Sequence, residues 1–184
     1  MSQNIGKTFE ENIKKSCPKW LFVYRPPDAA QAFENNNSKL RFSRHSPADY
    51  FWHNGKTGRL LIMECKTFQG SCSFERSKNE TGVIHHYQIE SLRKFSEYPK
   101  VVSGFLLDFR KSDNTYFLSI DDFLKMISKI SKKSFSEKDM IEHCSPILIG
   151  KKKLKVNYRY DIEKFLLDVE NKYNEKHEIT EENE

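Results

Sequence analysis

Two acidic residues and one lysine have the types and the spacing that chemistry on a phosphate group requires. Asp49 precedes Glu64 along the chain, and Lys66 follows Glu64 by two positions. Two carboxylates at close distance repel each other, so they are stable together only with a cation between them. Magnesium is commonly held by one or two carboxylates together with water and phosphate oxygens, and a bound metal lowers the pKa of its water. A nearby lysine can orient that water or stabilise the negative charge that develops on the phosphate.

Two strand-like runs, residues 48–53 and 59–67, are predicted to bring these side chains together. The residues between the runs include two glycines, which predicts a hairpin. With a four-residue turn, the antiparallel ladder places Asp49 opposite Glu64, at a Cβ separation of about 4.5–5.5 Å. Side chains alternate along a strand, so Lys66 shares the face of Glu64.

Two other segments contain parts of the same pattern. Glu170-Asn171-Lys172 has an acid two positions before a lysine, but it lies on the last predicted helix, whose geometry separates those two side chains. Pro27-Asp28 is followed by two alanines rather than by a strand. An ordinary ion pair is the alternative interpretation of Asp49, Glu64 and Lys66.

The composition predicts one compact domain with a basic body. The chain has 184 residues and a net charge of +5. Residues 168–184 contain seven acids and two lysines, a charge of −5, so residues 1–167 carry 29 basic and 19 acidic groups, a charge of +10. Since Lys and Arg displace counterions from phosphates, this body suits a polyanionic partner, although a merely soluble basic surface gives the same pattern. We expect a single domain over residues 1–167, followed by the end of the last helix and an acidic, flexible tail.

The cysteines and the apolar runs indicate the cellular compartment. No apolar run approaches the roughly 18–20 residues of a membrane span, and the first residues lack the apolar stretch of a secretory signal. We therefore expect a cytoplasmic protein with no membrane partner. The four cysteines form no CxxC pair and are expected to be reduced thiols, with Cys65 on the face of its strand away from Glu64. A zinc site is the alternative, but the spacings of its candidate ligands fit no closed zinc pattern; these are Cys65, Cys72, His85, His86, His143 and Cys144.

The remaining elements are predicted from hydrophobic periodicity and from turn residues. Ile5, Phe9 and Ile13 share one face of a first helix that Pro18 ends. Residues 26–45 form a long excursion without clear periodicity, which in a compact domain is functional or disordered. The other predicted elements are strands at 20–24, 101–109 and 115–120 and helices at 83–95, 121–130 and 161–173. Helices and hairpins in this order predict a mixed α/β domain with a partly antiparallel sheet.

Several short motifs, in a fixed order, make the chain similar to a known family. Besides the triplet that ends at Lys66, they are Asn4-Ile5-Gly6-Lys7-Thr8-Phe9-Glu10, Ser46-Pro47-Ala48-Asp49-Tyr50, His85-His86-Tyr87-Gln88-Ile89 and Gly104-Phe105-Leu106-Leu107. With these motifs, which span most of its length, the chain resembles the PD-(D/E)xK nuclease superfamily, and within it the RecU-type Holliday-junction resolvases. The resemblance implies a restriction-endonuclease-like α/β core, in which helices flank a mixed central sheet, with residues 26–45 as a projecting stalk-like loop.

The resemblance also implies roles for individual residues. Asp49 and Glu64 would be metal ligands together with the backbone carbonyl of Cys65, and Lys66 would be the catalytic lysine. Glu10 would complete the acidic cluster from the first helix, where its position alone favours an ordinary surface acid. Gln88 would position water or backbone, although by itself it is an unremarkable polar residue. The implied DNA contacts lie in and around the excursion, at Arg25, Lys39, Arg41, Arg44 and Ser46.

A reaction and a set of partners follow from the same resemblance. The expected activity is Mg²⁺-dependent hydrolysis of phosphodiester bonds that resolves Holliday junctions in recombination and repair, with Mn²⁺ as a substitute metal. Branched DNA is the expected substrate, a recombinase is a further expected partner, and paired cuts imply a homodimer with a two-fold axis. Two alternatives stay open: a restriction-like or repair endonuclease that cuts duplex DNA, and a non-catalytic DNA-binding or recombinase-modulating module. The lysine-rich run at 151–155 either contacts the DNA backbone or is an exposed loop or edge strand.

Overall fold

A six-stranded mixed sheet forms the centre of the computed structural model, which describes residues 4–27 and 46–181, with side chains up to residue 174. The strands lie in the order β1-β2-β3-β5-β6-β8. Their bounds are Phe22–Tyr24 (β1), Tyr50–Asn54 (β2), Arg59–Phe68 (β3), Val101–Phe109 (β5), Asn114–Ser119 (β6) and Ile147–Leu148 (β8). Most of the predicted excursion at 26–45, with Lys39, Arg41 and Arg44, lies outside the described residues.

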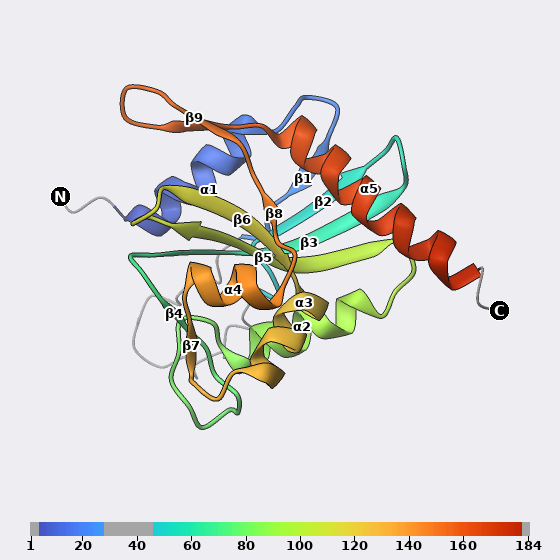
Figure 1. The fold of residues 1–184 in the computed structure, drawn as a ribbon. Coiled ribbons are helices and arrows are strands. Elements are labelled where there is room, and N and C mark those ends of the chain that lie inside the picture. The colour runs from blue at the N-terminus through green and yellow to red at the C-terminus, as the bar shows by residue number, and fades with distance from the viewer. Residues whose placement is uncertain (1–3, 28–45, 182–184) are drawn as a thin grey trace, which may run out of the picture.

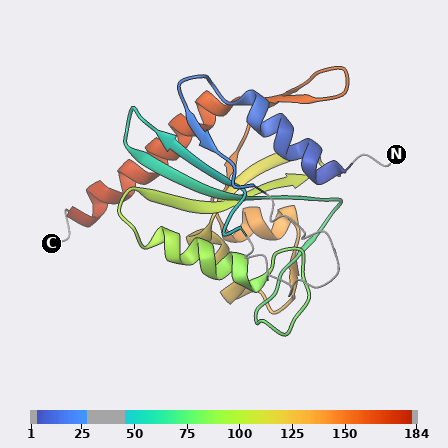
Figure 2. The ribbon, with the colours of Figure 1, turned by 180° about the vertical axis from the view of Figure 1, so that it is seen from behind.

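Helices cover both faces of this sheet (Figures 1 and 2). One face packs against α1 (Ile5–Ser16) and the first half of α5 (Ile162–Glu181), and Phe9, Ile13 and Phe165 enter that core. The other face packs against α2 (His86–Ser96), α3 (Ile120–Lys129) and α4 (Glu137–His143). This arrangement confirms the predicted mixed α/β fold, with a central sheet flanked by helices.

The hairpin of β2 and β3 has the register that the sequence predicted. Asn54 is paired with Arg59 and Tyr50 with Met63, so the four residues between the strands form the turn. The turn closes through Gly58, whose N–H donates to the carbonyl oxygen of Asn54 at 2.8 Å. The φ angle of Gly58 is +74°, a left-handed conformation that favours glycine.

A buried carboxylate fastens this hairpin to α5. Glu170 accepts hydrogen bonds from Arg59 Nε at 2.9 Å and from Thr57 Oγ1 at 2.7 Å. Two positions farther along the helix, Lys172 instead donates to Asp122 Oδ2 at 2.7 Å. Glu170 and Lys172 therefore point to different partners, and the second acid-x-lysine triplet has a structural role, as expected from helical geometry.

Strands β3 and β5 run parallel, and the chain returns from one to the other through α2. The paired residues run from Leu60 and Val101 to Phe68 and Phe109, so both strands end at the same edge of the sheet. Gly104 lies in the buried part of β5, opposite Ser119 of β6. The carboxyl ends of β3 and β5 are where side chains from several elements can meet.

The structure corrects several predicted boundaries and adds short elements. The last helix, predicted at 161–173, continues to Glu181 into the segment expected to be a tail, and the helix predicted at 83–95 begins at His86. The added elements are α4 and the strands β4 (Cys72–Ser73), β7 (Ser134–Phe135), β8, β9 (Lys151–Lys153) and β10 (Tyr158–Tyr160). Strands of two or three residues are too short to show a period. The sequence could indicate β1 only through the apolar run at 20–24, and it left an edge strand open at 151–155, where β9 lies; β4, β7, β8 and β10 had no such signal.

The described residues contain neither a disulfide between cysteines nor a helix that could span a membrane. Cys17, Cys65, Cys72 and Cys144 are all described and all free, which agrees with the expected reduced thiols. Within residues 4–27 and 46–181, no helix has both the length and the apolar character needed to cross a membrane.

We expect Gly104→Ala to destabilise the fold strongly. A Cβ atom at this position would collide with the carbonyl oxygen of Leu118 and lie 2.9 Å from Ser119 Cα, and the paired backbone of β6 cannot move away cheaply. The free energy of unfolding should fall by about 3 kcal/mol, at the upper end of what overpacking costs. Urea denaturation measures this loss. In the control variant Gly55→Ala, where a Cβ meets nothing within 4 Å, stability should hardly change, and equal losses in both variants would contradict the close approach.

Candidate active site

The candidate site lies at the carboxyl end of β3, where β2 begins on the neighbouring strand. The paired ladder of β2 and β3 ends at Tyr50 and Met63, and Asp49 is the residue just before it. Asp49 is held on both its backbone and its side chain: its N–H donates to the carbonyl oxygen of Met63 at 3.1 Å, and its Oδ2 accepts from the backbone N–H of Cys65 at 2.8 Å. These bonds depart from the regular ladder, so the predicted pairing of Asp49 with Glu64 stays a prediction, whereas the charge of Asp49 does act on Glu64.

Glu64 is a buried carboxylate with two side-chain donors. Lys66 Nζ lies 3.0 Å from Glu64 Oε1, and Gln88 Nε2 donates to the same oxygen. Burial raises the pKa of Glu64 to about 7, the neighbouring Lys66 counteracts this rise, and the charge of Asp49 adds to it. Desolvation therefore raises the pKa of Glu64 by more than the Lys66 ammonium group lowers it. The single charge of Lys66 does not balance the negative charges of both Glu64 and Asp49.

Gln88 reaches the site from the start of α2, and its orientation is fixed by the helix cap. Its Oε1 accepts a hydrogen bond from the backbone N–H of His85 at 3.0 Å, which turns the amide NH₂ toward Glu64. The predicted role of Gln88 as a positioning residue thus has a local geometric basis, because a single side chain connects the helix start to the buried acid.

Glu75 is a neighbour of the site that sequence reasoning missed. Its Oε1 lies 2.7 Å from His85 Nδ1, and its Oε2 accepts from the backbone N–H of His86 at 2.8 Å. The hydrogen bond from His86 and then that with His85 hold the pKa of Glu75 below its usual range. Glu75 lies in a polar loop with no motif of its own, so only the fold shows that it anchors the start of α2 beside Gln88.

Tyr87 lies in one of the motifs that carry the family resemblance, and the sequence predicts no role for it. Its ring stacks on that of His85, with centroids 5.6 Å apart and an angle of 11° between the planes. Burial raises the pKa of Tyr87, and the charges of Glu64 and Asp49 raise it further. The Tyr87 hydroxyl therefore lies within electrostatic range of Glu64 and Asp49, and its raised pKa keeps it protonated at neutral pH.

Glu10 approaches from α1 and is paired with Arg25. Arg25 Nη2 lies 2.6 Å from Glu10 Oε2, and the Tyr50 hydroxyl donates to the carbonyl oxygen of Glu10 at 2.9 Å. The charge of Glu10 contributes to the raised pKa of Glu64, so the helix does bring a third acid near the pair. Of the residues predicted to contact DNA, Arg25 thus lies beside Glu10, and Ser46 donates to the carbonyl oxygen of Ala48 at 2.7 Å.

Cys65 offers its backbone, and not its sulfur, to the site. The thiol points into the core beside α1 and α5, and burial raises its pKa well above the usual range. Since the N–H of Cys65 is directed to Asp49, strand alternation directs its carbonyl oxygen to the same side of β3. The oxygen donors available to a cation are therefore the carboxylates of Asp49 and Glu64 and the Cys65 carbonyl, a hard set that fits Mg²⁺.

Metal sites built from side chains alone are absent from the part of the chain that the structure describes. No three His, Cys, Asp or Glu side chains there are grouped as such a site requires. The alternative zinc site at Cys65, Cys72, His85, His86, His143 and Cys144 is thus not assembled in these residues, because Cys65 and Cys72 are buried in the cores on opposite faces of the sheet. The acid pair would need its carbonyl and outside ligands to complete a metal shell.

The chain is extensively similar in sequence to a prophage protein and distantly similar in structure to a solved resolvase. No protein-family model matches the chain. The SPbeta prophage-derived uncharacterized protein YotM of Bacillus subtilis is 31% identical over 176 residues, which cover 89% of this chain and 85% of that protein. Among solved structures, the Holliday junction resolvase Hjc of Archaeoglobus fulgidus is similar with a TM-score of 0.46 and 12% identity, over 76% of this chain and 93% of that chain. The second similarity is too distant to assign chemistry to this site.

We expect Glu64→Gln to stabilise the metal-free protein near neutral pH. Because the pKa of Glu64 rises from 4.5 to about 7 on folding, the folded chain binds more protons than the unfolded chain between these values, and stability falls as pH rises through them. Glutamine removes this loss and can still accept from Lys66 and Gln88. The gain should be on the order of 2 kcal/mol at pH 8 and should vanish near pH 4.5.

Thermal unfolding with a chelator, followed across this pH range, measures the difference. Glu142→Gln is the matched control, because Glu142 is an exposed acid of α4. A gain for Glu64→Gln that does not depend on pH would contradict burial as the origin of the raised pKa.

Proposed function

This chain belongs to the family of the prophage-derived protein YotM, and we propose that it is a metal-dependent endonuclease that hydrolyses the phosphodiester backbone of DNA. One observation carries the proposal: the buried Glu64 lies within reach of the charge of Asp49, while Lys66 Nζ lies 3.0 Å from Glu64 Oε1. A fold gains nothing from burying a carboxylate beside another unless the pair has a use, since burial and repulsion both cost stability.

The residues of the site fit a magnesium ion. Asp49, Glu64 and the Cys65 carbonyl would hold it, and Mn²⁺, which takes similar oxygen ligands, would substitute. The raised pKa of Glu64 supports this assignment, because a divalent cation supplies the positive charge that Lys66 alone does not. When bound, such an ion neutralises the phosphate and lowers the pKa of a coordinated water.

The other side chains of the site have positioning and electrostatic roles. Lys66 carries a compact positive charge that can orient a water molecule or stabilise the charge on a phosphate oxygen. Gln88 holds Glu64 in place through its amide and can present that amide to water. Glu10 adds negative charge from α1, and its partner Arg25 lies where a phosphate beside the acids would also find a cation.

The proposed substrate is branched DNA, specifically the Holliday junctions formed in recombination and repair. The basic body, with a charge of +10 over residues 1–167, suits a polyanion. Resolving a four-way junction takes two symmetric cuts, so the active form would be a homodimer with its two sites related by a two-fold axis. A recombinase would be a further partner in this process.

Mutation of the site should abolish cleavage while preserving DNA binding. We expect Mg²⁺-dependent nicking by the wild-type chain, none with chelator, and a loss of at least about 10³-fold in rate for Asp49→Asn and for Lys66→Ala. Asparagine at position 49 can still accept from the N–H of Cys65, so the local fold should survive. Single-turnover assays on labelled DNA measure the rates.

The control for charge is Lys94→Ala, an exposed lysine of α2 far along the helix from Gln88. Its rate should equal that of the wild type. Undiminished cleavage by either site variant would overturn the assignment of the site, and binding without any cleavage by the wild type would favour a non-catalytic module.

Substrate shape separates a resolvase from an enzyme that cuts ordinary duplex. At equal salt and Mg²⁺, we expect a four-way junction to be cut several-fold faster than a linear duplex of the same sequence, with paired nicks in opposite strands. Equal rates on both substrates would instead indicate a restriction-like or repair endonuclease. Analytical ultracentrifugation of the protein with and without the junction measures whether it is a dimer.

A further inference from the structure

A basic hairpin projects from the body of the protein (Figure 1). It consists of β9, β10 and the turn between them, residues 151–160, and we call it the basic arm. Residues 151–159 contain four lysines, one arginine and no acid. This density of positive charge is far higher than that of the chain as a whole, and the candidate active site does not use it.

The register of the arm separates one anchoring lysine from an outward pair of cations. Lys151 is buried, lies 3.3 Å from Asp108 Oδ1 and 2.8 Å from Asp113 Oδ1, and stacks over the ring of Tyr158. Lys152 and Arg159 are paired across the strands, so alternation places both on the other face. Lys151 therefore fastens the arm to the sheet, and Lys152 and Arg159 on its other face are available to contact a ligand.

The pair of Lys152 and Arg159 is unfavourable for the isolated fold. Like charges directly opposite each other on two strands are destabilising. Both side chains are exposed, and among the residues that the structure describes neither lies within 4.0 Å of a carboxylate. An arrangement that repels itself in the free protein becomes favourable when a polyanion lies across it.

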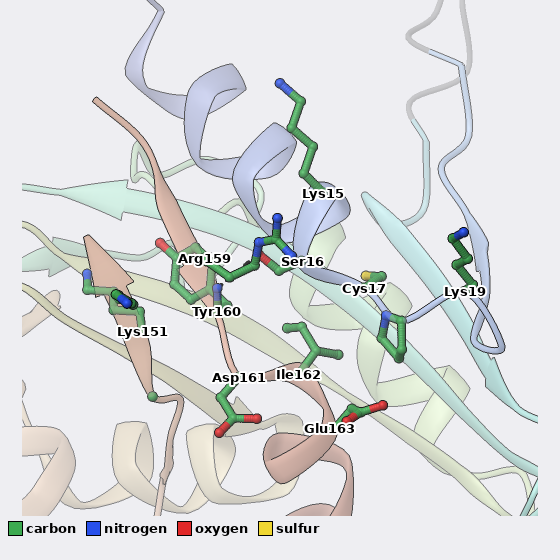
Figure 3. Close-up of a pocket in the computed structure, with 13 residues that line it drawn as sticks. Lys15, Ser16, Cys17, Lys19, Lys151, Arg159, Tyr160, Asp161, Ile162 and Glu163 are labelled. Carbon is green, nitrogen blue, oxygen red and sulfur yellow. Dashed lines mark hydrogen bonds between the residues drawn. The ribbon is translucent and has the colours of Figure 1, made fainter. Parts of the chain in front are cut away.

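The same two residues border a pocket with further cations (Figure 3). The pocket has a volume of about 890 Å³ and lies between the arm, the last turn of α1 and the start of α5; Lys15 and Lys19 also line it. Arg159 extends toward the last turn of α1 in this view.

The two acids of the pocket already have partners. Asp161 accepts from the backbone N–H of Lys164 at 3.1 Å, and Glu163 accepts from Trp20 Nε1 at 3.2 Å. The pocket thus combines several exposed cations with acids that face other groups, which is the composition of an anion-binding surface.

Two hydrogen bonds through Asp108 connect the arm to the end of β3 that carries the candidate site. Thr67, the residue after Lys66, donates to Asp108 Oδ2 at 2.9 Å. Asp108 Oδ1 in turn accepts from Lys151 at the base of the arm. Because Thr67 and Asp108 are paired at the ends of β3 and β5, the arm is held at the end of the sheet where Glu64 and Lys66 lie.

We propose that the basic arm, together with the adjoining pocket, is a second binding surface for the phosphate backbone of DNA, separate from the site that would cut it. The inference rests on the proposed function only in its choice of DNA as the polyanion. Lys152 and Arg159 are the central contacts, and Lys155 near the turn and Lys15 and Lys19 at the pocket add weaker ones. The arm would hold a stretch of duplex beside the cut and so orient it.

Salt-dependent binding tests the proposal without any cleavage. Fluorescence anisotropy with a labelled linear duplex and a labelled four-way junction, in chelator and between about 50 and 200 mM salt, gives the affinity and its salt slope. For Lys152→Ser/Arg159→Ser we expect binding weaker by roughly 10-fold or more at 0.1 M salt, and a slope reduced by about 1.8 for two lost phosphate contacts. The swap Lys152→Arg/Arg159→Lys should bind as the wild type does.

The matched control is Lys125→Ser/Lys129→Ser, which removes two exposed lysines from α3 on the opposite face of the sheet. Its slope should stay close to that of the wild type, and thermal unfolding should show that both double variants are folded. Equal losses in the two double variants would mean that only net charge matters, and would overturn the arm as a site. Unchanged DNA binding by the arm variant would also overturn the proposal. The same holds if the arm binds an acidic peptide with the sequence of residues 168–184 and its mutation leaves DNA binding unchanged.

The outcomes for the arm and for the proposed function are distinguishable. Wild-type DNA binding that depends on the arm, without Mg²⁺-dependent cleavage, would support the arm and contradict the nuclease. Cleavage that persists with an arm variant of unchanged affinity would support the nuclease and contradict the arm.

Discussion

The register of one hairpin determines the geometry of the whole candidate site. Because Asn54 pairs with Arg59 and Tyr50 with Met63, the ladder ends next to Asp49 and Glu64, and a slip by one residue would move every side chain of β2 to the other face. The hydrogen bonds of Glu170 to Arg59 and Thr57 hold the turn against α5, far from the acids. The register is thus secured at the opposite end of the strands from the site.

Electrostatic cost explains why the neighbours of the acids are arranged as they are. Glu64 is buried beside a second acid, and this burial raises its pKa despite the ammonium group of Lys66. Gln88 is turned to donate to it, and Glu75 in turn fixes the start of the helix that carries Gln88. Each of these contacts lowers the cost of keeping a carboxylate where a cation and a phosphate could reach it.

Much of the fold and part of the site could be predicted from the sequence, and the failures have a common cause. Long, strongly patterned elements such as β3 and β5 were found, because their apolar runs are continuous. Short strands such as β4, β7, β8 and β10 were not found, since two or three residues show no period; β1 is equally short and was found only through its apolar run. Glu75 was missed for a related reason: it comes from a loop, and its importance lies only in partners ten or more residues away.

The sequence by itself determined the register of the β2–β3 hairpin, which brings Asp49 near Glu64, and the position of Lys66 two residues along β3, because turn length and strand alternation are local rules. It also determined the excess of basic residues. The family resemblance implied roles for Gln88 and Glu10, but only the tertiary structure decided how they approach those acids, that Arg25 pairs with Glu10, and that residues 151–160 form a separate basic arm. These facts depend on how helices pack on a sheet, and such packing arises from contacts between residues distant in the chain, which no local pattern encodes.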